Sequence, residues 1–107
     1  MKESIIQKAI MDYLRLKGCL VFKVNNGGVY IKSIDRYMRS PMKGISDIVG
    51  LTPGGTFIAI EVKSPNKKPS IEQLDFIDKV RKKNGIAFWV SSLDEMIGVW
   101  EGKFLKF

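Results

Sequence analysis

The hydrophobic pattern of the first 43 residues changes from helical to extended and then fades. Residues 3–16 place Ile6, Ile10 and Leu14 at helical spacing, and Gly18 follows as a helix stop. Residues 19–24 form a short, nearly continuous apolar run, which predicts a strand buried on both faces or nearly so. Residues 29–43 show no clear period, so we expect a loop there.

The second half of the chain contains two apolar runs, residues 44–51 and 57–63, on either side of a Pro-Gly-Gly turn. This pattern predicts a β-hairpin. A helix is expected from Ser70, with its apolar stripe formed by Ile71, Leu74, Ile77 and Val80. Residues 86–90 predict a further buried strand. Ser92 and Glu95 then have the spacing of a capping box, which predicts a short helix ending near Val99.

The hairpin can bring three charged side chains together. If Thr52 pairs with Thr56 across a three-residue loop, Asp47 falls directly opposite Glu61. Opposite residues share a face of the sheet, and Lys63 projects from that face because strand side chains alternate. A four-residue loop would shift the register by one position and put Asp47 and Glu61 on opposite faces.

Two adjacent carboxylates need a reason to coexist. At about 5 Å, with an effective dielectric constant near 20, they repel by roughly 3 kcal/mol. A divalent cation removes this penalty, and Mg²⁺ and Mn²⁺ prefer oxygen ligands. A plainer interpretation is that Asp47 is a turn residue and that Glu61 and Lys63 form a solvated strand end.

The sequence Gly44-Ile45-Ser46-Asp47, followed by Ile60-Glu61-Val62-Lys63, resembles the motif of the PD-(D/E)xK nuclease superfamily. More specifically, the chain resembles a minimal, phage-type VRR-NUC domain over residues 3–92. Further matching features are Glu3 with Gln7, the Asn-Asn-Gly element at 25–27, Ser70 with Gln73, and the strand at 85–91. Ser46 occupies a position where the superfamily often has proline.

The resemblance implies an α/β fold with a restriction-endonuclease-like core, a mixed β-sheet flanked by helices in the order α-β-β-β-α-β-α. It implies that residues 1–107 form one nuclease domain. Asp47 and Glu61 would hold Mg²⁺ or Mn²⁺, with the Val62 carbonyl as a further ligand and Glu3 at the edge of the site. Lys63 would act in catalysis, supported by Gln73. Without the resemblance, Glu3 could simply favour the helix dipole and Gln73 could simply cap its helix.

Composition narrows the chemistry further. The chain of 107 residues has no histidine, which excludes histidine general bases and zinc sites of the usual Cys/His kind. The single Cys19 leaves no disulfide framework and is expected to be a buried small hydrophobe. No apolar run approaches the length of a membrane span, so we expect a soluble, cytoplasmic protein with no membrane partner. We also expect no nucleotide cofactor.

The net charge of +7 favours a nucleic-acid partner. Basic and tyrosine side chains can contact phosphates and stack on unpaired bases, and they gather between residues 29 and 43. A solvated loop would have a similar composition. The candidate nucleic-acid-binding residues are Tyr30, Lys32, Arg36, Tyr37, Arg39 and Lys43, together with Lys67 and Lys68 in the following basic loop.

The resemblance implies a metal-dependent endonuclease acting on branched DNA, such as four-way junctions, in the replication or repair of a phage or mobile element. Symmetric cutting would need a homodimer. Two alternatives remain at this point. The chain could be a nucleic-acid-binding module without catalysis, or a nuclease or toxin that acts on RNA. The apolar, basic tail at residues 103–107 could add an edge strand or join a dimer interface.

Overall fold

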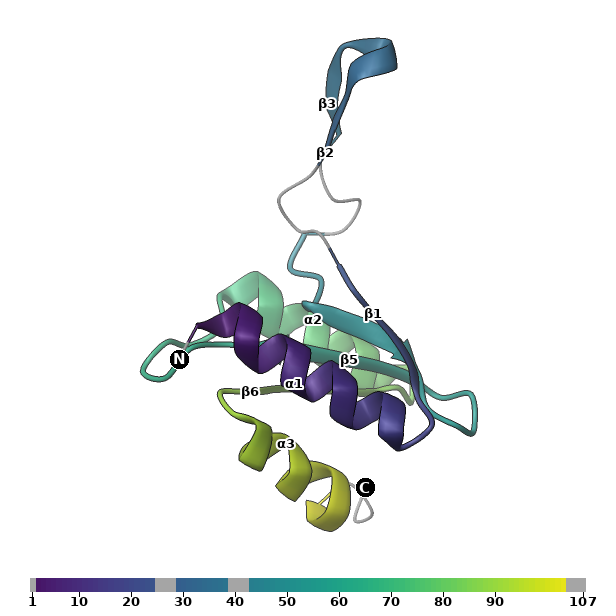
Figure 1. The fold of residues 1–107 in the computed structure, drawn as a ribbon, viewed down its shortest axis with the longest axis vertical. Helices are drawn as coiled ribbons and strands as arrows, with labels where there is room; N and C mark the ends of the chain where they lie inside the picture. Colours follow the sequence, from purple (N-terminus) through teal and green to yellow (C-terminus); the bar gives the residue numbers. More distant parts are fainter. Residues whose placement is uncertain (1, 25–28, 39–42, 104–107) are drawn as a thin grey trace.

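The computed structural model describes residues 2–24, 29–38 and 43–103, and Figure 1 shows the chain as a sheet with helices on both faces. The elements are α1 (Glu3–Leu16), β1 (Leu20–Lys23), β2 (Val29–Ile31), a 3₁₀ helix (Lys32–Ile34), β3 (Arg36–Met38), β4 (Ile48–Leu51), β5 (Phe57–Val62), α2 (Ile71–Lys82), β6 (Ile86–Val90), α3 (Leu93–Gly98) and a π-helical turn (Val99–Lys103). None of the described helices is long and apolar enough to cross a membrane.

The main sheet is mixed, as predicted, with the strand order β1-β4-β5-β6. β4 is antiparallel to both β1 and β5, whereas β5 and β6 are parallel. The predicted hairpin register is confirmed: Ile48 pairs with Ile60, and Leu51 pairs with Phe57. The Thr52 amide donates to the Thr56 carbonyl over 2.9 Å, which closes the three-residue loop.

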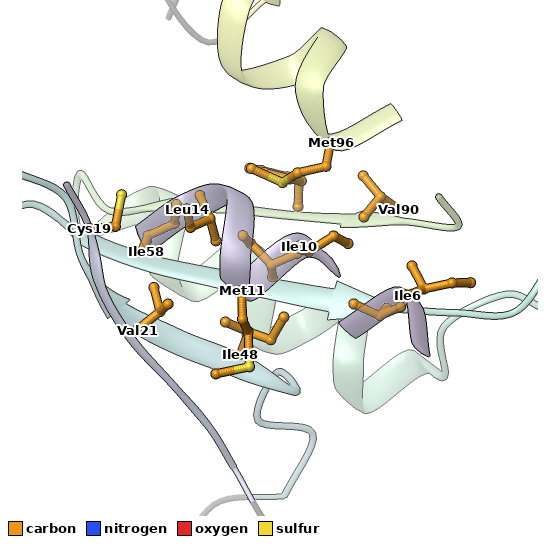
Figure 2. Packing of buried hydrophobic residues seen from close by; sticks show 13 residues of the cluster. Ile6, Ile10, Met11, Leu14, Cys19, Val21, Ile48, Ile58, Val90 and Met96 are labelled. Carbon is orange, nitrogen blue, oxygen red and sulfur yellow. The ribbon is translucent and has the colours of Figure 1, made fainter. Parts of the chain in front are cut away.

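One face of the sheet packs against α1 and α3 (Figure 2). Ile10 and Leu14 of α1, Met96 of α3, and Ile58 and Ile60 of β5 are fully buried in this larger core. α1 ends where the pattern predicts, since Gly18 adopts a φ of +87° and its amide donates to the Arg15 carbonyl. Glycine suits this left-handed position because it lacks a Cβ atom.

The other face packs against α2 through a smaller core that contains Val49, Ala59, Phe76, Ile77 and Val80. Odd-numbered residues of β5 therefore point toward α2, and even-numbered residues point toward α1. β5 lies between β4 and β6 and is buried along almost its whole length. This central position fixes the face from which Glu61 projects.

Two packing predictions were wrong. β1 is an edge strand, and Leu20 and Phe22 are 68% and 56% exposed, because α2 contacts β5 and β6 instead of covering β1. On α2, Ile77 and Val80 are buried as predicted, but Ile71 and Leu74 are 84% and 45% exposed. Phe76 takes their place in the core, so the buried stripe lies toward the end of the helix.

The expected loop at residues 29–43 was also only partly right, because β2 and β3 form a second, two-stranded sheet in which Tyr30 pairs with Tyr37. Figure 1 shows this hairpin standing away from the main body. It adds strands to the predicted element order. Residues 25–28, 39–42 and 104–107 lie outside the described residues, and with them the Asn-Asn-Gly element, Arg39 and most of the C-terminal tail.

Candidate active site

The predicted charged residues meet at one edge of the main sheet, where β5 ends and β4 begins. Asp47 immediately precedes β4, Glu61 is the penultimate residue of β5, and Lys63 directly follows it. The confirmed register places Asp47 level with Glu61 on the face that α2 covers. The first turn of α2 brings Gln73 to the same place.

Asp47 is held by the backbone of both neighbouring strands. Its Oδ2 accepts a hydrogen bond of 2.9 Å from the Val62 amide, which points the carboxylate across to β5. Its carbonyl accepts one of 2.7 Å from the Val24 amide, just beyond β1. Because both donors are backbone groups of the sheet, the carboxylate is positioned without any rearrangement of long side chains.

Glu61 is a buried acid, with a residue exposure of only 2%. Its Oε2 accepts a hydrogen bond of 3.1 Å from the Gln73 side-chain amide and lies 3.8 Å from the Lys63 ammonium. Its Oε1 is also buried and has no hydrogen-bond partner among the described residues. An unpaired buried carboxylate oxygen is costly, so this atom is available to a cation or a proton.

The surroundings of Glu61 disfavour its negative charge. Burial, followed by the negative charge of Asp47, raises the pKa of Glu61 from an ordinary value of 4.5 to about 8. Lys63 opposes this shift, and the charge of Glu3 adds to it. The carboxyl is thus mostly protonated at neutral pH unless a further positive charge approaches it.

Gln73 links the α2 capping box to Glu61. Its Oε1 accepts a hydrogen bond of 2.8 Å from the Ser70 amide, and its backbone amide donates to Ser70 Oγ over 3.1 Å, so the predicted box is confirmed. Its Nε2 contacts Glu61, and not Lys63 as we predicted. The capping role and the site role coexist because they use different ends of one amide.

Glu3 reaches the margin of the site from the start of α1. Its Oε2 accepts a hydrogen bond of 3.0 Å from the Ser64 amide, one residue beyond Lys63. Within the part of the chain that is described, no three Asp, Glu or Cys side chains gather closely enough to hold a metal ion between them. The metal-ligand roles of Asp47, Glu61, Val62 and Glu3 therefore all stay predictions.

Gly44 brings the chain leading to Asp47 against α2. Its φ is +80°, and a Cβ atom there would lie 2.3 Å from the Glu72 carbonyl oxygen. The Lys43 ammonium lies 3.4 Å from the Glu72 carboxylate in the same region. The glycine therefore allows the segment that leads to Asp47 to pack closely against the first turn of α2.

Sequence patterns did not reveal the backbone donors of the site. The amides of Val62 and Ser64 hold Asp47 and Glu3, and side-chain periodicity carries no signal for them. Ser46 is fully buried beside Asp47, and Gln7 is nearly so. Each has a buried side-chain oxygen without a partner in the described part of the chain.

The predicted nucleic-acid-binding residues that the structure describes lie in separate parts of the chain, and Arg39 is outside the described residues. Lys67 and Lys68 are exposed in the loop after Lys63, and Lys43 is exposed beside α2. Lys32 is exposed in the outlying hairpin, whose backbone also carries Tyr30, Arg36 and Tyr37. In the sequence, these residues either precede Asp47 at the start of β4 or follow Lys63 at the end of β5.

Comparisons with known proteins agree with this architecture. The family model of the VRR-NUC domain matches residues 1–93. A solved structure titled as a VRR-NUC domain is similar, with 26% sequence identity and a TM-score of 0.69, over 94% of this chain and 95% of that one. No curated protein matches. The chain therefore belongs to the VRR-NUC domain family, which is of the nuclease type.

Proposed function

We propose that this protein is a metal-dependent endonuclease that hydrolyses phosphodiester bonds of DNA. Membership of a nuclease-type family gives the reaction class. The observation that carries the proposal is the buried Glu61 carboxyl, held between Asp47, Lys63 and Gln73 with one oxygen unpartnered. A carboxyl in such a place is unsuited to a purely structural role, because burial and the neighbouring charge of Asp47 destabilise its ionised form more than Lys63, 3.8 Å away, stabilises it.

The donor set fits Mg²⁺ or Mn²⁺. Asp47 and Glu61 would hold the ion with the Val62 carbonyl, and Glu3 would lie at its edge. These are hard oxygen ligands, and a site with few protein ligands suits cations that retain water. When bound, the ion supplies a polarised phosphate and an activated water. Its charge would also offset the burial and the repulsion from Asp47 that together raise the pKa of Glu61.

The remaining residues act on charge and position. Lys63 is partly buried, with 19% side-chain exposure, so its ammonium is poorly screened and would stabilise negative charge on a phosphate at the sheet edge. Gln73 fixes the orientation of the Glu61 carboxyl. Asp47 cannot turn away without losing its hydrogen bond from the Val62 amide.

DNA is the proposed substrate because the chain is strongly basic and because exposed lysines flank the site. Lys43, Lys67 and Lys68 would contact phosphates near the scissile bond, and the β2–β3 hairpin would contact a more distant part of the substrate (Figure 1). We further propose branched DNA as the preferred substrate and a homodimer as the active form, in the replication or repair of a phage or mobile element.

The deciding experiment compares cleavage of duplex, single-stranded, flap and four-way-junction DNA, and of matched RNA, with Mg²⁺ or Mn²⁺ present. We expect DNA cleavage that EDTA and Glu61→Ala abolish. Activity that survives EDTA would exclude the metal role, and faster cleavage of RNA would reassign the substrate. If nucleic acid binds but is not cut, calorimetry of the free protein with Mn²⁺ is the next measurement. Absence of Mn²⁺ binding would identify a binding module, because such a module has no cause to take up the ion.

A further inference from the structure

The sheet face that packs against α2 is only partly covered. α2 contacts β5 and β6, and the part of this face beside it exposes Leu20, Phe22, Leu51 and Phe57 by 68%, 56%, 41% and 40%. The registers place Leu20 opposite Leu51 and Leu51 opposite Phe57, so these three side chains form one row across β1, β4 and β5. Large contiguous apolar patches on a soluble protein mark interaction sites.

This row leads into a groove beside the C-terminal half of α2. The groove has a volume of about 320 Å³ and is lined by Phe57, Phe76, Lys79, Val80, Lys83 and Gly85. Its floor is aromatic and aliphatic, and two lysines stand at its rim. We call it the lysine-rimmed groove.

The groove is separate from the candidate active site. Phe57 begins β5, whereas Glu61 lies near the end of the same strand. Likewise Gln73 belongs to the first turn of α2, whereas Lys79, Val80 and Lys83 lie at or beyond its last turns. A ligand bound in the groove would therefore not need to contact Asp47 or Glu61 of the candidate active site.

The rim lysines select the charge of the occupant. Lys79 pairs with Asp75 over 2.9 Å, but this pair is exposed and therefore weak, and no ion pair of Lys83 occurs within the described part of the chain. Two positive charges above an apolar floor complement a ligand that has carboxylates beside an apolar side chain. We propose that the lysine-rimmed groove docks an acidic peptide of a partner protein, with one leucine or phenylalanine inserted between Lys79 and Lys83.

The alternatives fit less well. A second copy of this chain, packed through the same face, would bring the two lysine rims together, and like charges brought together oppose association. A nucleobase would stack on an exposed aromatic ring, and of the two rings that line the groove only Phe57 is exposed, by 40%, whereas Phe76 is 8% exposed. An acidic, apolar peptide satisfies both the charge and the floor.

The test measures fluorescence anisotropy of a labelled peptide, four aspartates followed by Gly-Leu-Phe, titrated with full-length protein without metal. The decisive pair of variants is Lys79→Glu and Lys82→Glu. Lys79 and Lys82 lie on the same helix, each pairs over 2.9 Å with an aspartate four residues earlier, and their side-chain exposures are 72% and 74%. Only Lys79 lines the groove.

We expect Lys79→Glu to weaken peptide binding at least tenfold and Lys82→Glu to weaken it less than twofold. A peptide with serines in place of Leu-Phe should lose as much affinity as Lys79→Glu. Equal losses from the two variants would overturn the proposal, because the peptide would then be sensing net charge. The same holds for absence of binding, for a dimer that Lys79→Glu dissociates, and for an oligothymidylate that competes with the peptide. Cleavage is not measured, so failure here is independent of the proposed nuclease activity.

Discussion

At the scale of single residues, the site is defined by an acid that is destabilised when charged. Glu61 has a folded-state pKa of about 8 against an ordinary 4.5, caused first by burial and then by Asp47. Between these two values the folded state binds more protons than the unfolded state, so folding stability falls as the pH rises. The stabilising contribution is complete below about pH 4.5 and is lost as the pH approaches 8.

Glu61→Gln should remove this dependence. The amide keeps the shape and can still accept the Gln73 hydrogen bond, but it cannot ionise. In EDTA at pH 8 we expect the variant to unfold several degrees higher than the wild type, because the wild-type Glu61 is then partly ionised in a buried place. A stabilisation of about 1 kcal/mol corresponds to about 4–8 °C in a domain of this size. At pH 4.5 the two should differ little. Thermal unfolding across this pH range provides the measurement, with the exposed Asp94→Asn as control. Parallel curves for wild type and Glu61→Gln would show that Glu61 is not buried as an acid.

Lys63 makes a separate prediction, because its ammonium faces Glu61 whereas that of Lys67 is exposed in the following loop. Lys63→Ala should reduce the rate of DNA cleavage by about 10²–10³, the usual effect of losing one electrostatic stabiliser. Lys67→Ala, which removes the same charge, should reduce it only a few-fold through weaker binding. Rates under single-turnover conditions separate the two effects. Similar losses from both variants would mean that Lys63 serves general attraction.

At the scale of elements, α2 unites capping and chemistry in its first turn. Ser70 Oγ accepts from the Gln73 amide over 3.1 Å, and Ser92 Oγ of α3 accepts from the Glu95 amide over the same distance. Each serine satisfies one unpaired donor of its helix. Only the first cap also holds a side chain that contacts Glu61.

Ser70→Ala and Ser92→Ala should therefore destabilise the protein alike, by about 1 kcal/mol in urea unfolding. Only Ser70→Ala should also slow cleavage, several-fold, because losing the bond from the Gln73 backbone amide to Ser70 Oγ loosens the first turn of α2, and with it the Gln73 side chain that donates to Glu61. Cleavage is measured well below the unfolding midpoint of both variants. If Ser92→Ala slows cleavage as much, the loss follows from stability and the α2 cap has no role in positioning.

The sequence predicted the helices and strands themselves better than it predicted which of them pack against each other. The Pro-Gly-Gly turn predicted the hairpin of β4 and β5, but the sequence left a three-residue and a four-residue loop open, and the register of the three-residue loop is the one observed. The exposure of Leu20 and Phe22 could not be predicted, because it depends on where α2 lies across the sheet and not on the pattern of β1. Gln73 was correctly placed near the site, but its partner depended on side-chain geometry. The β2–β3 hairpin lacked any period because it does not pack on the main sheet.

At the scale of the whole molecule, each chain provides one set of Asp47, Glu61 and Lys63, whereas symmetric cutting of a four-way junction breaks two strands. A homodimer would supply the second site. Mixing wild type with Glu61→Gln should then form dimers with one active site, and on a supercoiled plasmid that extrudes a cruciform these dimers should nick where wild type linearises. We expect an excess of Glu61→Gln to raise the ratio of nicked to linear product, measured on agarose gels, because one intact site cuts one strand.

Glu61→Gln refolded separately and added after the wild type has bound serves as control. An unchanged ratio at every mixture, with total activity falling in proportion to wild type, would mean that single chains act independently and that the active form is a monomer.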